Sequence, residues 1–173
     1  MAIALYDLSV ANYLQTLGAV VGFLEKGLAH FTTNHVDLDE IVETRLAPDM
    51  LPFRFQLLSV AHHSLGAIEG VKNGLFQPPT QAPAHDYRAL QKIVGDAQDA
   101  LQKLTPAEVN ALEGRDVVFQ LRDFKMPFTA EGFLLSFSLP NFYFHAATAY
   151  DILRMKGVPI GKRDYMGQMR LKS

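Results

Sequence analysis

The stretch DLSVANYLQTLGAVVGFLEKGLAHFT, residues 7–32, decides the fold class, because its apolar residues return at helical spacing. They recur at three- and four-residue steps: Val10, Tyr13, Leu14, Leu17, Val21, Leu24, Leu28 and Phe31. One continuous apolar stripe of this kind is typical of an amphipathic helix. The sequence therefore predicts a long first helix over about 7–32, with one face turned toward a core.

Three further segments, about 50–74, 85–104 and 130–155, have the same helical character. Pro52 falls in the first turn of its segment, where a missing N–H does no harm. Pro140 lies inside the last segment, lacks an N–H and clashes with the carbonyl four residues earlier, so it predicts a kink. Glycine and proline at 157 and 159 end that helix in the usual order.

Shorter elements are expected between the long helices. Asp37 is a cap for a short helix over 38–46, and Thr105 followed by a proline and an acid predicts another. Residues 115–129 show no helical stripe, so Val117–Phe119 is predicted as a strand, paired in a small hairpin with 125–128. The fold class that follows is all-α: a four-helix bundle with short extra helices and one small β-hairpin, in a single domain over 1–173.

The amino-acid composition limits the classes of partner that can be expected for this protein. Lys and Arg total 16 and Asp and Glu total 18, giving a net charge of −2, so no basic surface is expected to attract nucleic acid. The start of the chain lacks a signal peptide pattern, and no apolar run is long enough to span a membrane. The chain contains no cysteine, which excludes disulfides and thiolate chemistry. A cytoplasmic protein is the expectation.

The histidines are the strongest candidates for chemistry. His62 and His63 sit inside an otherwise apolar helix, and His145 sits in the most apolar part of the last one. Adjacent helical residues point about 100° apart, so one of His62 and His63 is expected to face the core and the other a rim. Asn141 lies one turn before His145 on the same face. Two imidazoles with a third polar ligand are a common basis for a metal site.

A structural alternative stands beside this interpretation, since a buried histidine is usually a hydrogen-bonded core residue. The sequence has neither His-Glu-x-x-His nor the Glu-x-x-His pairs of di-iron bundles. Asp49, just before the second long helix, is expected either to cap that helix or to face the site. The aromatic residues of the last helix are expected to lie mostly in the core or on a dimer face.

Two stretches carry a resemblance to a known family: RLAPDMLPFRFQLLSVAHHS (45–64) and SLPNFYFHAATAYDILRMKGVPIGKRDYMG (138–167). They resemble an uncharacterised branch of the DinB/YfiT-like superfamily of putative metalloenzymes. The resemblance implies a four-helix bundle, commonly a homodimer, with no assigned activity. Better-known members bind a divalent metal through three histidines, and some are thiol-dependent transferases or isomerases.

The resemblance also assigns the site residues. His145 matches the second histidine of a His-x-x-x-His pair, and Asn141 replaces the first. The remaining ligand falls at His62 or His63, with His62 preferred. Because an amide oxygen is a poorer ligand than imidazole for zinc or nickel, this departure weakens the expected metal site.

Two functions from different classes remain open at this point. The first is a degenerate metal or small-ligand pocket with metal-dependent transferase or hydrolase activity, holding zinc, nickel or manganese. The second is a non-catalytic homodimeric binding or structural protein without a cofactor, in which the histidines are satisfied core groups. No nucleic-acid or membrane partner is expected in either case.

Overall fold

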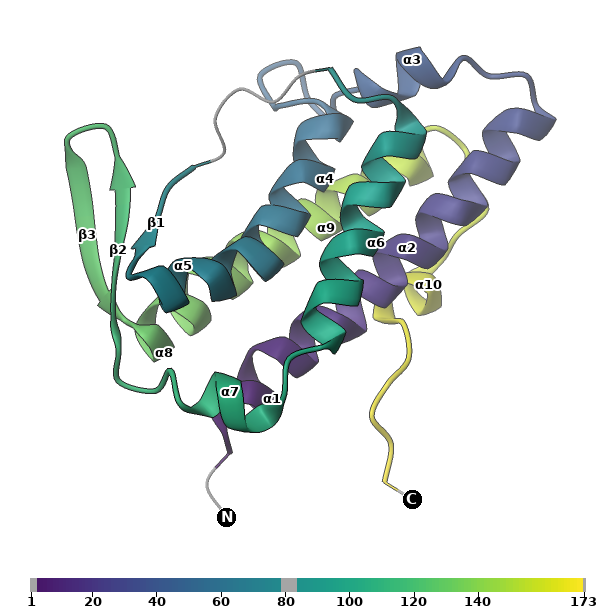
Figure 1. Ribbon diagram of the computed structural model, residues 1–173. Helices are drawn as coiled ribbons and strands as arrows, with labels where there is room; N and C mark the ends of the chain where they lie inside the picture. Colours follow the sequence, from purple (N-terminus) through teal and green to yellow (C-terminus); the bar gives the residue numbers. More distant parts are fainter. Residues whose placement is uncertain (1–2, 79–83, 173) are drawn as a thin grey trace.

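The computed structural model describes residues 3–78 and 84–172, and in that part of the chain four long helices pack side by side, with a small sheet at one end (Figure 1). α2 (Val10–Thr33) packs on α6 (Tyr87–Gln102) and on α9 (Leu139–Met155). α4 (Phe53–Ala61) also packs on α6 and α9, and so completes the four-helix bundle. α2 and α9 run in one direction, and α4 and α6 in the other (Figure 1). The predicted four-helix bundle is confirmed.

Two of the long helices contain a π-helical turn in mid-course. α4 continues through the π-helix η1 (His62–Gly66) into α5 (Ala67–Asn73). In the same way α8 (Ala130–Phe133) continues through the π-helix η2 (Leu134–Ser138) into α9. The two predicted helices are therefore continuous, but their regular hydrogen bonding shifts for one turn. π-turns are rare and are often found at functional sites.

Pro140 gives η2 a physical cause. A proline inside an α-helix leaves one hydrogen bond unmade and presses on the carbonyl four residues earlier, here that of Ser136. In the structure Pro140 occupies the first turn of α9, directly after η2. The structure therefore shows a local change of helical hydrogen bonding directly before Pro140, and the predicted kink of the helix axis stays a prediction.

The short helices are α1 (Leu5–Leu8), α3 (Leu38–Val42), α7 (Pro106–Asn110) and α10 (Lys162–Met166). Asp37 caps α3 by accepting a hydrogen bond from the Asp39 N–H, and Thr105 and Glu108 form a reciprocal capping box on α7, both as predicted. The capping role expected of Asp49 is wrong. Pro52 occupies the N-cap of α4, and Asp49 is exposed in the preceding turn.

The sheet has the order β1–β2–β3. β2 (Asp116–Leu121) and β3 (Phe124–Thr129) form the predicted antiparallel hairpin, with Val117 opposite Phe128. β1 (Leu75–Phe76) adds to β2 in parallel, directly after the end of α5. A two-residue strand has no periodicity of its own, so the sequence could not predict it. Its effect is to bring Phe76 over the end of the bundle.

The C-terminal segment lies along α2 (Figure 1). α10 is tied to α2 by an ion pair between Lys26 and Asp164, whose N···O distance is 2.5 Å. Farther along, the Arg170 guanidinium donates to the Asn12 side-chain oxygen at 2.7 Å. Within residues 3–78 and 84–172, none of the helices has the length and apolar character that a membrane crossing requires.

Candidate functional site

His63 and His145 meet between η1 and α9. Their ring centroids are 5.8 Å apart and the rings are nearly parallel, with an interplanar angle of 18°. His63 is 8% exposed, and His145 is half-buried. The structure thus brings together two histidines that are 82 positions apart in the sequence, counting from 63 to 145. We refer to His63, His145, Gln56 and Asn141 as the histidine pocket.

His62 faces away from this pocket, so the preference for His62 as the ring opposite His145 is wrong. Its Nε2 lies 2.7 Å from the carbonyl oxygen of Gln77, and it therefore donates a hydrogen bond there. It lines a shallow groove of about 360 Å³ between the α4–α5 helix and α6. The buried face of α4 explains why His63, and not His62, lies opposite His145. His63 follows the buried Gln56 by seven residues, which is two helical turns, so the two residues lie on the same face of the helix.

Gln56 fixes the tautomer of the His145 ring. The sequence did not lead us to expect Gln56 as a site residue. The Gln56 amide nitrogen donates to the Leu51 carbonyl at 2.7 Å, so its Oε1 is the atom that faces His145. His145 Nδ1 lies 2.8 Å from that oxygen. An amide oxygen only accepts, so His145 carries its proton on Nδ1 and its lone pair on Nε2. This is the arrangement in which metal-binding histidines are commonly oriented by an outer partner.

His63 has an unsatisfied nitrogen. Its Nδ1 is buried and has no hydrogen-bond partner among the described residues. Burial is the main reason that the pKa of His63 falls from 6.5 to about 3, and the neighbouring His62 and His145 add to the effect. Burial likewise lowers the pKa of His145 to about 4. Both rings are therefore neutral at pH 7, which is the form that can bind a cation.

Asn141 lies one turn before His145, as predicted. Its amide nitrogen donates to the Phe137 carbonyl at 2.7 Å, a bond back along its own helix. The Oδ1 atom is the acceptor that remains on this side chain. Asp49 is exposed in its turn before α4, and no contact ties it to the pocket in the described part of the chain.

A buried chain of hydroxyl groups holds the backbone at His63. The Ser138 hydroxyl donates to the His63 carbonyl at 2.6 Å. Tyr13 Oη lies 2.8 Å from Ser138 Oγ, so Tyr13 is the donor in that contact. This chain joins the last residue of η2 to the second residue of η1, and it connects both to α2. Burial raises the pKa of Tyr13, which keeps its proton in place.

An aromatic wall closes one side of the pocket. It comes from the sheet, α8 and η2, and its members are Phe76, Phe119, Phe128, Phe133 and Phe137. The His63 ring lies 5.4 Å from the Phe76 ring and 5.8 Å from the Phe137 ring, centroid to centroid. The small sheet thus supplies an apolar cover for His63. Of the last-helix aromatic residues that were expected mostly in the core or on a dimer face, Phe133 and Phe142 are buried, whereas Tyr143 and Phe144 are exposed.

The donor set differs from a three-histidine centre. Across residues 3–78 and 84–172 there is no group of three or more His, Cys, Asp or Glu side chains placed to hold a metal. The pocket does contain two neutral imidazoles, one of them with an orphaned buried nitrogen, and Asn141 lies one helical turn before His145. Two imidazoles are only part of a usual metal donor set, so a cation here would have to complete its shell with weaker oxygen ligands.

The comparisons with known proteins agree with this bundle. A family model described as a domain of unknown function, DUF1993, matches residues 5–166. The chain belongs to the DUF1993 family. The crystal structure of a DinB family member from Shewanella denitrificans matches with a TM-score of 0.80 and 27% identity, covering 98% of this chain and 95% of that one. A search of curated proteins found no match. The resemblance to an uncharacterised DinB-like branch is confirmed.

Membership of this family establishes the fold but assigns no activity. DUF1993 is defined as a family of unknown function, so the histidine pocket has no role inherited from it. The predicted binding role of His63, Asn141 and His145 stays a prediction.

Proposed function

We propose that the histidine pocket binds a divalent cation, with zinc and nickel preferred over manganese. The observation that carries the proposal is the pairing of His63 with His145, in which one ring has an orphaned buried nitrogen and the other presents a free Nε2. Borderline divalent cations prefer imidazole nitrogen, whereas manganese prefers oxygen. Such an ion would be held by His63 and His145, with Asn141 completing the protein ligands.

Each residue of the pocket has a separate task in this proposal. Gln56 orients the His145 ring through its hydrogen bond to Nδ1. The aromatic wall excludes water from the His63 side, and the Tyr13–Ser138 pair fixes the backbone below His63. A bound divalent cation supplies Lewis acidity to a substrate, the chemistry of the transferase or hydrolase class. Two imidazoles without a third strong ligand make a site of modest affinity.

Calorimetric titration of protein purified without an affinity tag tests the proposal. Zinc and nickel should bind at one site per chain and raise the melting temperature by mass action. His145→Phe and His63→Phe should abolish that binding while the chain remains folded. His62→Phe is the matched control, because His62 lies next to His63 but faces Gln77, and this variant should bind as the wild type does. Equal binding by all four proteins would refute the assignment.

A second function is favoured by a different observation. Large apolar side chains are exposed around α9 and the turn before α4, namely Leu51 (49%), Leu135 (39%), Tyr143 (37%) and Phe144 (56%). Exposed apolar surface often marks a protein interface. We therefore propose a homodimer through the exposed part of α9 around Phe144 as the non-catalytic alternative. Light scattering on Phe144→Glu tests it: a dimer that becomes monomeric supports the alternative, and a wild-type monomer rejects it.

A further inference from the structure

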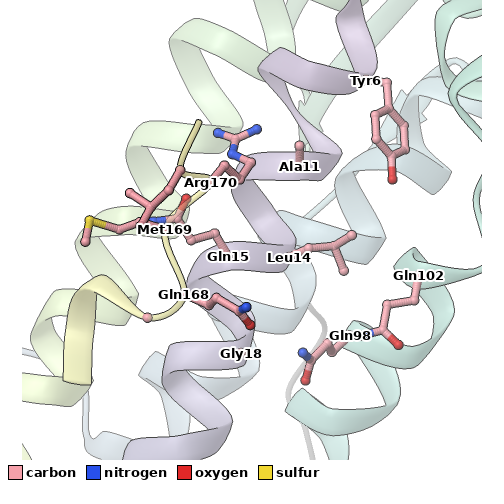
Figure 2. A pocket seen from close by; sticks show the side chains of 12 residues that line it. Tyr6, Ala11, Leu14, Gln15, Gly18, Gln98, Gln102, Gln168, Met169 and Arg170 are labelled. Carbon is pink, nitrogen blue, oxygen red and sulfur yellow. The ribbon is translucent and has the colours of Figure 1, made fainter. Parts of the chain in front are cut away.

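A separate cavity of about 700 Å³ lies between α2, α6 and the C-terminal segment (Figure 2). Ala11, Leu14 and Gly18 of α2 form its floor. Gln98 and Gln102 come from α6, and residues 167–171 come from the tail. Its volume is in the range of small-molecule sites, roughly 300–1,000 Å³. We call it the glutamine groove.

The lining has a distinct chemistry. Gln15, Gln98, Gln102 and Gln168 bring amide groups to the groove, and Tyr6 brings a hydroxyl (Figure 2). Amide groups both donate and accept hydrogen bonds. Of the described residues that line the groove, Arg170 alone is charged. Leu14 and Met169 add apolar surface. The groove thus suits a ligand that has an amide, a short apolar part and one negative charge.

The C-terminal tail forms one wall of the groove and is fixed there by specific contacts with α2. The Gln15 amide donates to the Met166 carbonyl at 3.0 Å, just before Gly167. Gly167 has φ +61° and ψ −152°, a conformation open essentially to glycine alone. A Cβ at Gly167 would lie 2.9 Å from the Gln15 carbonyl oxygen, so the tail is seated directly on α2. Arg170 is held in place by its bond to Asn12.

We propose that the glutamine groove binds a carboxylate linked to an amide, as in an N-acyl amino acid or the C-terminal residue of a peptide. Arg170 has guanidinium N–H groups beyond the one given to Asn12, and these form strong charge-assisted hydrogen bonds to a carboxylate. The glutamine amides pair with the amide of the ligand, and Leu14, which points toward α6 (Figure 2), contacts its apolar side chain. None of these residues belongs to the histidine pocket, so the two proposals stand or fall separately.

Titration with three probes tests this inference: N-acetyl-leucine, N-acetyl-leucinamide and an acetylated tripeptide ending in leucine. Calorimetry gives the affinity, and the side-chain amide signals of glutamine in NMR spectra locate the site. N-acetyl-leucine should bind and shift those signals. Removing the carboxylate, or making Arg170→Gln, should weaken binding at least about tenfold. Tighter binding of the tripeptide would identify a peptide C-terminus as the source, and tighter binding of N-acetyl-leucine a free acyl amino acid.

A matched pair of glycine variants locates the site in the groove. A Cβ at Gly18 would lie 3.3 Å from the Gln98 amide nitrogen, so Gly18→Leu fills the groove and should abolish binding. Gly22 is one turn farther along α2, and in the described part of the chain a Cβ there meets no atom within 4 Å beyond the backbone of its own helix. Gly22→Leu should therefore bind normally. Equal affinities for the acid and its amide, or unchanged binding in Gly18→Leu, would overturn the proposal.

Discussion

The histidine pocket and the glutamine groove lie on the same bundle but are built in opposite ways. The pocket is largely buried, walled by phenylalanine rings, and located where two helices depart from α-helical hydrogen bonding. The groove is lined by amides and lies over regular turns of α2 and α6. The buried His63 is held on a π-turn whose backbone is fixed by the Ser138 hydroxyl, whereas the groove presents its amides from the surface of regular helices and from the tail. The predictions below test that difference.

The largest effect of any single substitution on stability is expected in the aromatic wall. Phe76→Ala removes a side chain that is 3% exposed and contacts both His62 and His63, so it should destabilise the protein by about 3–4 kcal/mol. Phe124→Ala, on the same sheet but 58% exposed, should change the stability by less than about 0.5 kcal/mol. Urea unfolding measures both. Similar losses in the two variants would contradict the role of the wall.

Acid should destabilise the protein through the pocket. His63 and His145 have folded pKa values of about 3 and about 4, below the ordinary 6.5, so the unfolded chain binds more protons below pH 6.5. Stability should be complete above pH 6.5 and fall as the pH drops toward 4, by up to about 1.4 kcal/mol per pH unit for each histidine. Denaturant unfolding at several pH values measures the slope, and His63→Phe should reduce it by about half.

Removing the hydroxyl of Ser138 should lower the stability of the protein by an intermediate amount. Ser138→Ala leaves the His63 carbonyl and the Tyr13 hydroxyl without their partner, at a cost of about 2 kcal/mol. Tyr13→Phe removes only the donor at the end of the chain and should cost about 1 kcal/mol. The double variant should cost clearly less than the sum of the two, because the residues share one network. Additive losses would show that the hydroxyl chain does not act as a unit.

The smallest change in the free energy of unfolding is expected from a substitution in the C-terminal tail. Gly167→Ala places a Cβ against the Gln15 carbonyl in a backbone conformation that alanine avoids, so the tail should detach locally. Global unfolding should change by about 1 kcal/mol or less, because few buried contacts depend on the tail. Hydrogen exchange should show faster exchange after Met166 and unchanged protection in α4 and α9. Faster exchange around the histidine pocket would argue that the two regions are coupled.

Periodicity predicted the regular parts of this fold well. The apolar stripes of α2, α6 and the two composite helices are present near their expected bounds, and so is the β2–β3 hairpin. β1 escaped prediction because two residues show no pattern, and its pairing with β2 joins positions 43 residues apart, from Leu75 to Val118. The π-turns could be suspected only at Pro140, where a local steric conflict is visible in the sequence.

The site was predictable only in outline. A convergence of the second and last long helices was expected, but the wrong neighbour was preferred in the His62–His63 pair. The phase of the stripe through Phe53, Leu57 and Val60 would have selected His63, and Gln56 was visible as a polar residue in that stripe. The tautomer of His145 depends on the Leu51 carbonyl, which is a backbone group and leaves no trace in the sequence.

The paired π-turns also affect where the length of the chain can vary. Each π-turn holds one residue more than the same stretch of α-helix would, because its hydrogen bonds span five residues instead of four. A residue added to a regular α-helix turns every later side chain by about 100°. The π-turn η1 takes up its additional residue locally, so α4 and α5 both keep their faces toward the bundle and β1 keeps its register with β2. We therefore expect related chains to tolerate a one-residue difference in length at η1 and η2, as at the surface turns, but not elsewhere in these two helices.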